Sequence, residues 1–223
     1  MNIIALLFFL ICWLGLEFLF DHSPAKHKSL SSLMAKQRLL WMYSMAKRDL
    51  RMIDTQILFG QQPAATFFVS ACILAIGGTF GLLGATDTIL KIYDDFSIAE
   101  NITRKIWEIQ VIGFAFIFTY AFFKFFWSFR LFNYCSILVG VVPNLSSSSY
   151  EERKGAAHAA AQMNIIASRH FTAGLRGIFF ALAYLGWFLG SHVLIGSTIF
   201  VVFVLLRRQY ISQARKILVK LDE

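Results

Sequence analysis

Two charged side chains stand out because they interrupt apolar runs of the chain. Glu17 and Lys124 each lie a few residues before the expected cytoplasmic end of a run. A charge within a membrane span is costly and usually faces protein or water. Equal depth makes the two side chains candidate partners in an ion pair, with an ion pathway or separate contacts to the interface as alternatives. We favour a structural pair or separate contacts with the interface over an ion pathway, because neither charge lies near the middle of its run.

A second group of charges follows Trp41 in the pattern WxxxMxxRDxRxxD. On a continuous helix, Arg48, Arg51 and Asp54 would share one side, because residues three apart are neighbours. Arginine binds phosphate and carboxylate groups with paired donors. Arg48 and Arg51, with Arg176 further along, are therefore candidate contacts for an anion or a lipid head group. The alternative is a helix face whose charges pair with one another.

The histidines and cysteines follow no pattern typical of a metal, haem or redox site. On a continuous helix, His158 and His170 would be about 18 Å apart, too far to share a metal. The sequence has no GxSxG, Walker, CxxC or HExxH motif, so hydrolytic, nucleotide-driven and thiol chemistry have no basis in it. We expect no enzyme activity, no cofactor and no metal.

Four apolar runs must position these residues. Three of them, about 3–20, 64–84 and 109–129, have lengths near the roughly 20 residues of a membrane-crossing helix. The fourth, Phe171 to Leu206, is too long for one crossing and short for two. At 57% hydrophobic and 15% charged residues, the chain lies outside soluble averages. We predict an all-α integral membrane protein.

The basic residues alternate between the loops and so predict the topology. The segment after the first run holds seven Lys and Arg, whereas the segment from Ala85 to Glu108 holds three against five acids. Five more follow the third run and five lie in the tail. The positive-inside rule then places the N-terminus outside and the C-terminus in the cytoplasm. The fourth run would then form a short hairpin that turns at Gly190-Ser191-His192 and either crosses a thinned bilayer or is re-entrant. The alternative is one long tilted helix with an external tail.

The prediction is therefore a single membrane domain over residues 1–223 with five transmembrane helices. The last two spans are about 174–190 and 193–206, and the cytoplasmic segments are about 21–63, 130–173 and 207–223. These segments are expected to be helical, with one helix from Leu30 to Leu58. Ser148 and Ser149 each precede a glutamate by three residues, Glu151 and Glu152. This capping-box pattern would begin a second helix through an alanine-rich stretch.

Small residues at four-residue spacing indicate close helix packing. Gly77 with Gly81, and Gly186 with Gly190, each lie on one helix face. Such faces let helices approach closely in lipid, either within one protomer or between subunits. The net charge of +8 lies just outside the apolar runs, where anionic lipid and topology explain it, so we expect no nucleic-acid partner.

The motif WxxxMxxRDxRxxD, the segment FFVSACILAIGG from Phe67 and the segment FTAGLRGIFFALAYLGWFLG from Phe171 together resemble the membrane proteins grouped as domain of unknown function 599. The resemblance rests on Trp41, Arg48, Arg51, Asp54, Gly174 and Arg176. It implies a multi-pass topology over nearly the whole chain and implies no activity and no catalytic residues.

These observations favour a non-catalytic module or subunit of the cytoplasmic (inner or plasma) membrane, which contacts lipids and associates with itself or with partner proteins. The alternative is a homo-oligomeric ion channel or transporter. Its pore would form between protomers, because polar groups within the runs are sparse. Arg48, Arg51, Lys124 and Arg176 at its inner mouth would favour anions.

Overall fold

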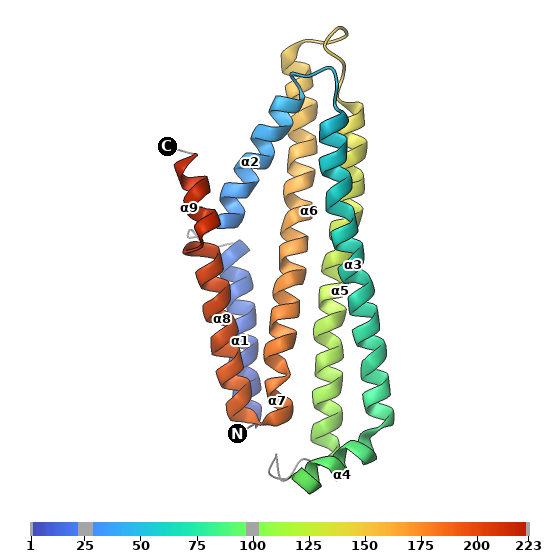
Figure 1. Ribbon diagram of the computed structural model, residues 1–223, viewed down its shortest axis with the longest axis vertical. Helices are drawn as coiled ribbons and strands as arrows, with labels where there is room; N and C mark the ends of the chain where they lie inside the picture. Colours follow the sequence, from blue (N-terminus) through green and yellow to red (C-terminus); the bar gives the residue numbers. More distant parts are fainter. Residues whose placement is uncertain (1, 22–28, 97–102, 222–223) are drawn as a thin grey trace.

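The architecture is a bundle of long helices that run along its length, with shorter helices at one end and along one side (Figure 1). The computed structural model describes residues 2–21, 29–96 and 103–221, and no strand occurs in these ranges. The helices, in chain order, are α1 (Asn2–Asp21), α2 (Leu30–Met45), α3 (Met52–Gly84), α4 (Thr86–Phe96), α5 (Arg104–Val141), α6 (Tyr150–Tyr184), α7 (Gly186–Leu189), α8 (Ser191–Tyr210) and α9 (Gln213–Lys220).

Five helical stretches in these ranges are long and apolar enough to cross a membrane. They are α1, α3, α5, the stretch from α6 through α7, and the stretch that begins with α8. The expected all-helical fold with five such helices is therefore confirmed. In α1, Ala5, Phe9 and Trp13 lie at helical spacing and form a buried face. Ile4 and Ile11 on the remaining faces are exposed. This helix is therefore apolar on its exposed faces as well as on its buried one, as expected of a helix in lipid.

The last apolar run folds as a hairpin and not as one long helix. α7 ends at Leu189 and α8 begins at Ser191, and between them Gly190 adopts a φ of 138°. That conformation is almost restricted to glycine, which explains the residue at the turn. The expected shortness of both helices is wrong: α8 has 20 residues, about 30 Å, and the preceding helix begins far upstream at Tyr150.

Parts of the polar segments extend the long helices, whereas α2 and α9 form helices of their own in these segments. α3 begins 12 residues before the predicted span at 64, and α5 continues 12 residues past its predicted end at 129. The predicted helix from Leu30 to Leu58 is also wrong, because α2 ends at Met45 and α3 starts at Met52. The capping box is confirmed: the Ser149 hydroxyl accepts from the Glu152 amide, and the Glu152 carboxylate accepts from the Ser149 amide.

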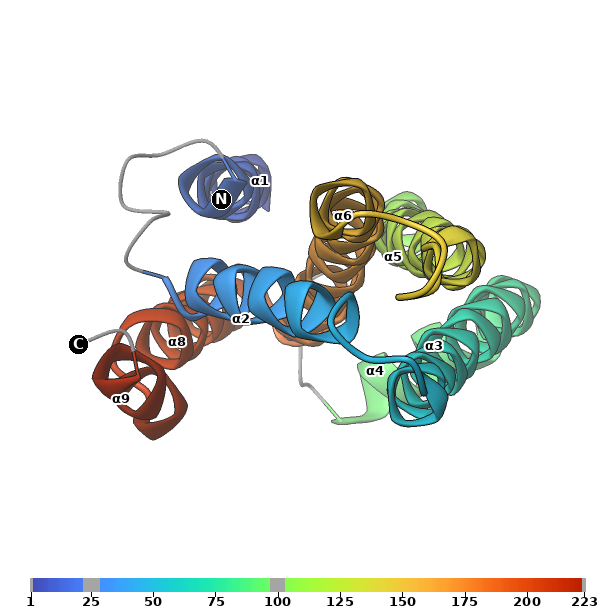
Figure 2. The same ribbon diagram turned by 90° about the horizontal axis from the view of Figure 1, so that it is seen from above.

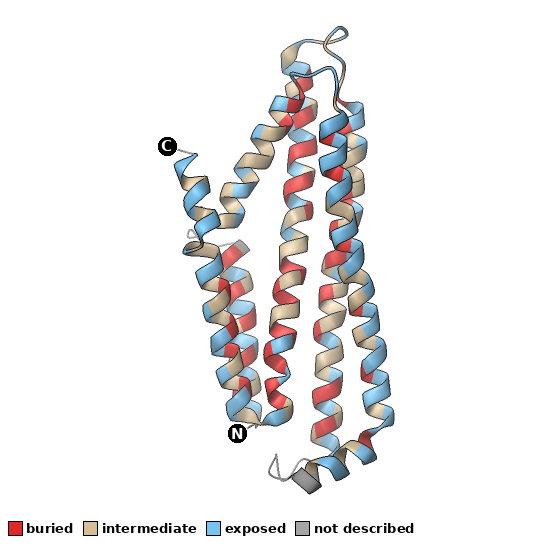
Figure 3. Ribbon diagram, in the orientation of Figure 1, coloured by how far each residue is buried: buried red, intermediate tan, exposed pale blue. Residues whose placement is uncertain are grey.

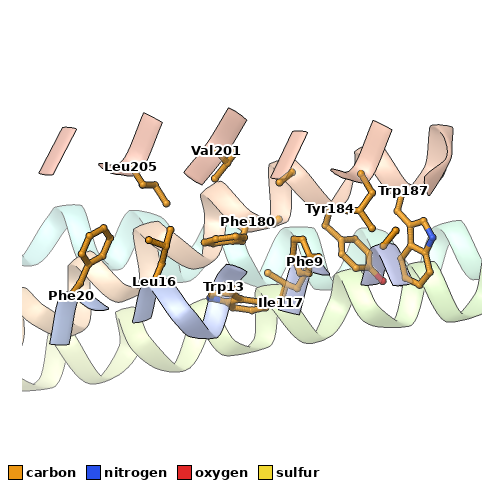
Figure 4. Close-up of a cluster of buried hydrophobic side chains, with 14 residues drawn as sticks. Phe9, Trp13, Leu16, Phe20, Ile117, Phe180, Tyr184, Trp187, Val201 and Leu205 are labelled. Carbon is orange, nitrogen blue, oxygen red and sulfur yellow. The ribbon is translucent and has the colours of Figure 1, made fainter. Parts of the chain in front are cut away.

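α6 lies in the middle of the bundle, with α5 and α3 on one side and α1, α8 and α2 on the other (Figure 2). Buried residues follow the faces that these helices turn toward one another, whereas the lower half of α3 is largely exposed (Figure 3). At the end near the N-terminus, aromatic rings from α1 and α6 fill the space between α1, α5, α6 and α8 (Figure 4). Trp13 stacks on Phe180 with 5.7 Å between ring centroids.

A second core lies at the opposite end, between α2, α3, α5 and α6. Met42 and Met45 of α2 pack there against Ala157, Ala160 and Ala161 of α6. The small alanine side chains let α2 approach α6 closely, as the alanine-rich sequence indicated. The two cores meet about halfway along α6, and this is where α1 and α8 end and α2 begins (Figure 1).

Candidate functional site

Glu17 pairs with Arg176 at the junction of the two cores. The Arg176 guanidinium donates from Nη2 to Glu17 Oε2 at 2.5 Å and from Nε to Oε1 at 3.1 Å. The Tyr120 hydroxyl donates to the same carboxylate at 3.1 Å. The exposed fractions of the two charged side chains are 6% for Arg176 and 17% for Glu17. This bidentate pair ties α1 to α6 and, through Tyr120, to α5.

The predicted Glu17–Lys124 pair is therefore corrected. The Lys124 ammonium lies 5.2 Å from the centre of the Tyr120 ring, in a cation–π contact, while the Tyr120 hydroxyl faces Glu17. The two residues do lie near one another, but Tyr120 stands between them. Arg176, which we predicted as an anion or head-group contact, is instead the direct partner of Glu17.

The charges of the WxxxMxxRDxRxxD motif bridge two helices and do not share one. Asp54, at the start of α3, is fully buried. Its Oδ1 accepts from Trp41 Nε1 at 2.8 Å and pairs with Arg48 Nη1 at 3.2 Å. Trp41 lies on α2 and Arg48 in the connection to α3, so this carboxylate fastens the α2–α3 turn.

Two arginines hold the same end of the bundle through main-chain carbonyls. Arg51 donates to the carbonyls of Val142 and Pro143, the latter at 2.6 Å. Arg153 of α6 donates to the Ala46 carbonyl at 3.1 Å, just past the end of α2. Helix ends leave carbonyls without intrahelical partners, and here distant guanidinium groups satisfy them. The predicted anion contact at Arg51 is thus occupied by the protein, whereas Arg48 is 46% exposed.

A polar cluster that the sequence analysis did not predict joins four helices. Asn164 of α6 is fully buried. Its amide donates to Gln61 of α3 at 3.0 Å and to the Cys135 sulfur of α5 at 3.6 Å, and its carbonyl accepts from Arg38 of α2. Burial lowers the pKa of the Arg38 guanidinium, an effect that nearby Cys135 opposes. Arginine nevertheless keeps its charge in proteins. A single asparagine in an alanine-rich helix was the only sequence feature that pointed to this cluster.

Arg38 also faces a cavity of about 220 Å³ between α1, α2, α6 and α8. Arg169, Arg176 and Arg208 line it as well. The remaining lining combines hydroxyl and amide side chains with apolar ones, namely Phe20, Ser29, Leu30, Ser31, Ser32, Met34, Ala35, Ile165, Ser168, Thr172, Leu175, Phe179, Leu205 and Gln209. Arginine side chains bind anions, and four of them line this one cavity, although Arg176 is paired with Glu17.

Comparison with known families accounts for nearly the whole chain. Residues 4–214 match the model of a family described as protein of unknown function, DUF599. The chain belongs to this family. The resemblance carried by the three sequence motifs is thereby confirmed. No curated protein and no solved structure matches this DUF599 protein.

The glycines that carried packing predictions differ in their surroundings in this DUF599 protein. A Cβ at Gly186 would lie 2.9 Å from the Val193 carbonyl oxygen, so α7 and α8 approach closely there, whereas Gly190 forms the turn. A Cβ at Gly77 or Gly81 would meet no atom within 4 Å. These two glycines therefore do not pack against another helix of the described chain.

Gly174 explains another part of the family resemblance, since a Cβ there would come within 2.8 Å of the Phe125 ring. The ring occupies the space that a larger residue would need, and α5 and α6 pack tightly as a result.

As for metals, no three His, Cys, Asp or Glu side chains gather into a possible site in the ranges that the structure describes.

Proposed function

We propose that this DUF599 protein is a non-catalytic, multi-pass protein of the cytoplasmic membrane, with its N-terminus outside and its C-terminus in the cytoplasm. Five helices long and apolar enough to cross support insertion. The bias in basic residues supports the orientation: Arg48, Arg153 and Arg207 lie toward the end formed by α2 and α9, whereas the opposite end carries α4 with Asp87.

We further propose that the protein works as a module or subunit that associates with itself or with partner proteins, and the outward face of α3 carries this proposal. Only 11% of the apolar window of α3 is buried, the smallest share among the five stretches. On this helix Gly77 and Gly81 face open space, and Leu74 and Phe80 are exposed. In lipid, small residues on a helix surface permit close contact with another helix.

The test is native mass spectrometry of protein extracted gently from its own membrane. We expect an oligomer, or a fixed set of unlike partners, that is lost when Gly77→Leu and Gly81→Leu are combined. Gly15→Leu is the matched control, because a Cβ at Gly15 also meets no atom within 4 Å but lies on α1. A wild-type protein that is monomeric in several mild detergents and carries no partner would refute association.

The alternative, a homo-oligomeric channel or transporter that favours anions, has narrower support. The space between α1, α5, α6 and α8 is filled by rings such as Phe9 and Trp13 (Figure 4), so a pore would have to form between protomers. Arg51 and Arg176, two cations of the expected inner mouth, are bound within the chain. Anion flux into liposomes containing the purified oligomer would favour the channel, and a tight oligomer without flux would favour the module.

A further inference from the structure

Four arginines line the cavity at the junction of the two cores. Arg176 is neutralised by Glu17. Arg38, Arg169 and Arg208 also line the cavity, and none of them pairs with a carboxylate among the residues that the structure describes. Arg38 is bonded only to the neutral amides of Asn164 and Gln61. Three arginines that line one cavity and have no carboxylate partner among the described residues favour a bound anion.

Neutral groups around the cavity add further donors for an anion. The first turn of α2 lines it with Ser31 and Ser32, and Ser29 caps this helix. The amides of a helix N-terminus and the helix dipole favour negative charge. Thr172 of α6 also lines the cavity, but its hydroxyl donates to the Ser168 carbonyl. The neutral donors therefore come from α2, where Gln209 of α8 donates to the Ser31 hydroxyl at 2.7 Å.

The other wall is apolar and points to the source of the anion. Phe20 ends α1, Leu205 lies near the end of α8, and Leu175 and Phe179 belong to α6. These residues continue into the apolar stretches of the same helices. The cavity of about 220 Å³ is smaller than the roughly 300–1,000 Å³ of sites that enclose a whole drug-sized ligand. It can take a head group, while attached acyl chains would lie outside along the helices.

We infer that this cavity binds the phosphate head group of an anionic phospholipid. In this arrangement Arg169 and Arg208 contact the phosphate from the exposed side and Arg38 contacts it from the interior. Groups of the first turn of α2, such as the Ser31 hydroxyl, donate to it as well. The arrangement lies where α1 and α8 end, the depth at which basic residues meet lipid head groups. The inference rests on membrane insertion as proposed above, but it does not depend on association between chains.

The test measures phosphatidylglycerol binding to the full-length protein in detergent by native mass spectrometry, with enough salt to screen diffuse attraction. The double variant Arg169→Gln/Arg208→Gln removes two exposed cavity charges. The control Arg207→Gln/Lys216→Gln removes the same net charge from neighbouring exposed positions that do not line the cavity. We expect the cavity variant to bind the lipid about 10-fold or more weakly and the control to bind as the wild type does. Equal losses in both variants would overturn the inference.

A second variant tests the cavity itself and leaves the charge unchanged. Ala35 lines the cavity, so Ala35→Leu should fill part of it and weaken phosphatidylglycerol binding; unchanged binding would mean that the lipid sits elsewhere. Inorganic phosphate serves as the competing probe. If it displaces the lipid at equal concentration, the ligand is a soluble phosphate compound and the lipid assignment is wrong. A failure of membrane insertion would appear separately, as protein recovered without membranes.

Discussion

Replacing either member of the Glu17–Arg176 pair should strongly destabilise the protein. Two hydrogen bonds join the side chains at 2.5 and 3.1 Å, and both groups are mostly buried. Removing one partner of a buried ion pair leaves an uncompensated charge and costs about 3–5 kcal/mol. Glu17→Gln and Arg176→Met should each lower the free energy of unfolding by roughly this amount. For a chain of this size, the loss corresponds to a melting temperature roughly 6–20 °C lower.

A double-mutant cycle measures the pair itself. The variant that combines Glu17→Gln with Arg176→Met has no unpaired charge, so its stability should be higher than the sum of the single losses predicts, by about 2 kcal/mol or more. Thermal unfolding in detergent, followed by circular dichroism, supplies the four stabilities. A parallel cycle with Lys124→Met provides the comparison, because Lys124 contacts the Tyr120 ring and not the carboxylate.

The two coupling energies show whether Glu17 pairs with Arg176, as in the structure, or with Lys124, as its depth along the helix suggested. The structure requires a large coupling of Glu17 with Arg176 and a coupling with Lys124 below about 0.5 kcal/mol, the level of independent sites. If the Lys124 coupling is as large as that of Arg176, the reasoning from the structure is refuted. If all single variants melt as the wild type does, the pair contributes nothing and the charges are solvated.

Three further outcomes are expected. Gly190→Ala should cost about 1–3 kcal/mol in unfolding free energy, because the turn has a φ of 138°, whereas Gly196→Ala within α8 should not destabilise. Asp54→Ala should lower the free energy of unfolding by about 3 kcal/mol, since Trp41 and Arg48 lose their acceptor. Asp49→Ala, at an exposed position, should change it by less than about 0.5 kcal/mol. Equal effects would contradict the role of Asp54 as a buried acceptor. A cysteine at the C-terminal end of α9, in a background without native cysteines, should react with a membrane-impermeant maleimide only after intact cells are permeabilised, and reaction without permeabilisation would reverse the orientation.

The long helices could be predicted because hydrophobicity and length are properties of single segments. Each apolar run had to be helical to satisfy its own backbone in lipid, and the capping box at Ser149 marked the start of α6. The ends of most other helices could not be predicted in this way. Hydropathy locates the apolar part of a helix, whereas α5 and α6 continue through segments rich in good helix formers that carry charge.

The break between α2 and α3 shows a different limit. No glycine or proline lies between Met45 and Met52, so local sequence favoured a continuous helix. The chain turns here because residues far away in the sequence hold it. Arg153 donates to the Ala46 carbonyl, and Arg51 donates to the carbonyls of Val142 and Pro143. Contacts across about 100 residues decide this boundary, and a single sequence without comparison to others contains no pattern that reports them.

The same limit explains why the partner of Glu17 was misjudged and why the cavity was missed. Depth along a helix can be read from the sequence, but the neighbours of a helix cannot. α6 lies between α1 and α5 in the bundle. Arg176 of α6 therefore binds the Glu17 carboxylate, whereas Lys124 of α5 contacts the Tyr120 ring. Arg38, Arg169 and Arg208 are far apart in the sequence and come together only because α1 and α8 end where α2 crosses α6.

This ending of two helices beside one that continues links stability to the inferred binding site. Below the junction, α6 is covered by α1 and α8, and above it by α2. The change of partner leaves a gap at which polar residues can face a cavity without lying in the apolar cores. Glu17 neutralises Arg176. The other three arginines that line the cavity have no carboxylate partner in the part of the chain that the structure describes. An anion there would contact groups from α2, α6 and α8 at once, so its binding should raise the melting temperature of the wild type and raise it less in the Arg169→Gln/Arg208→Gln variant.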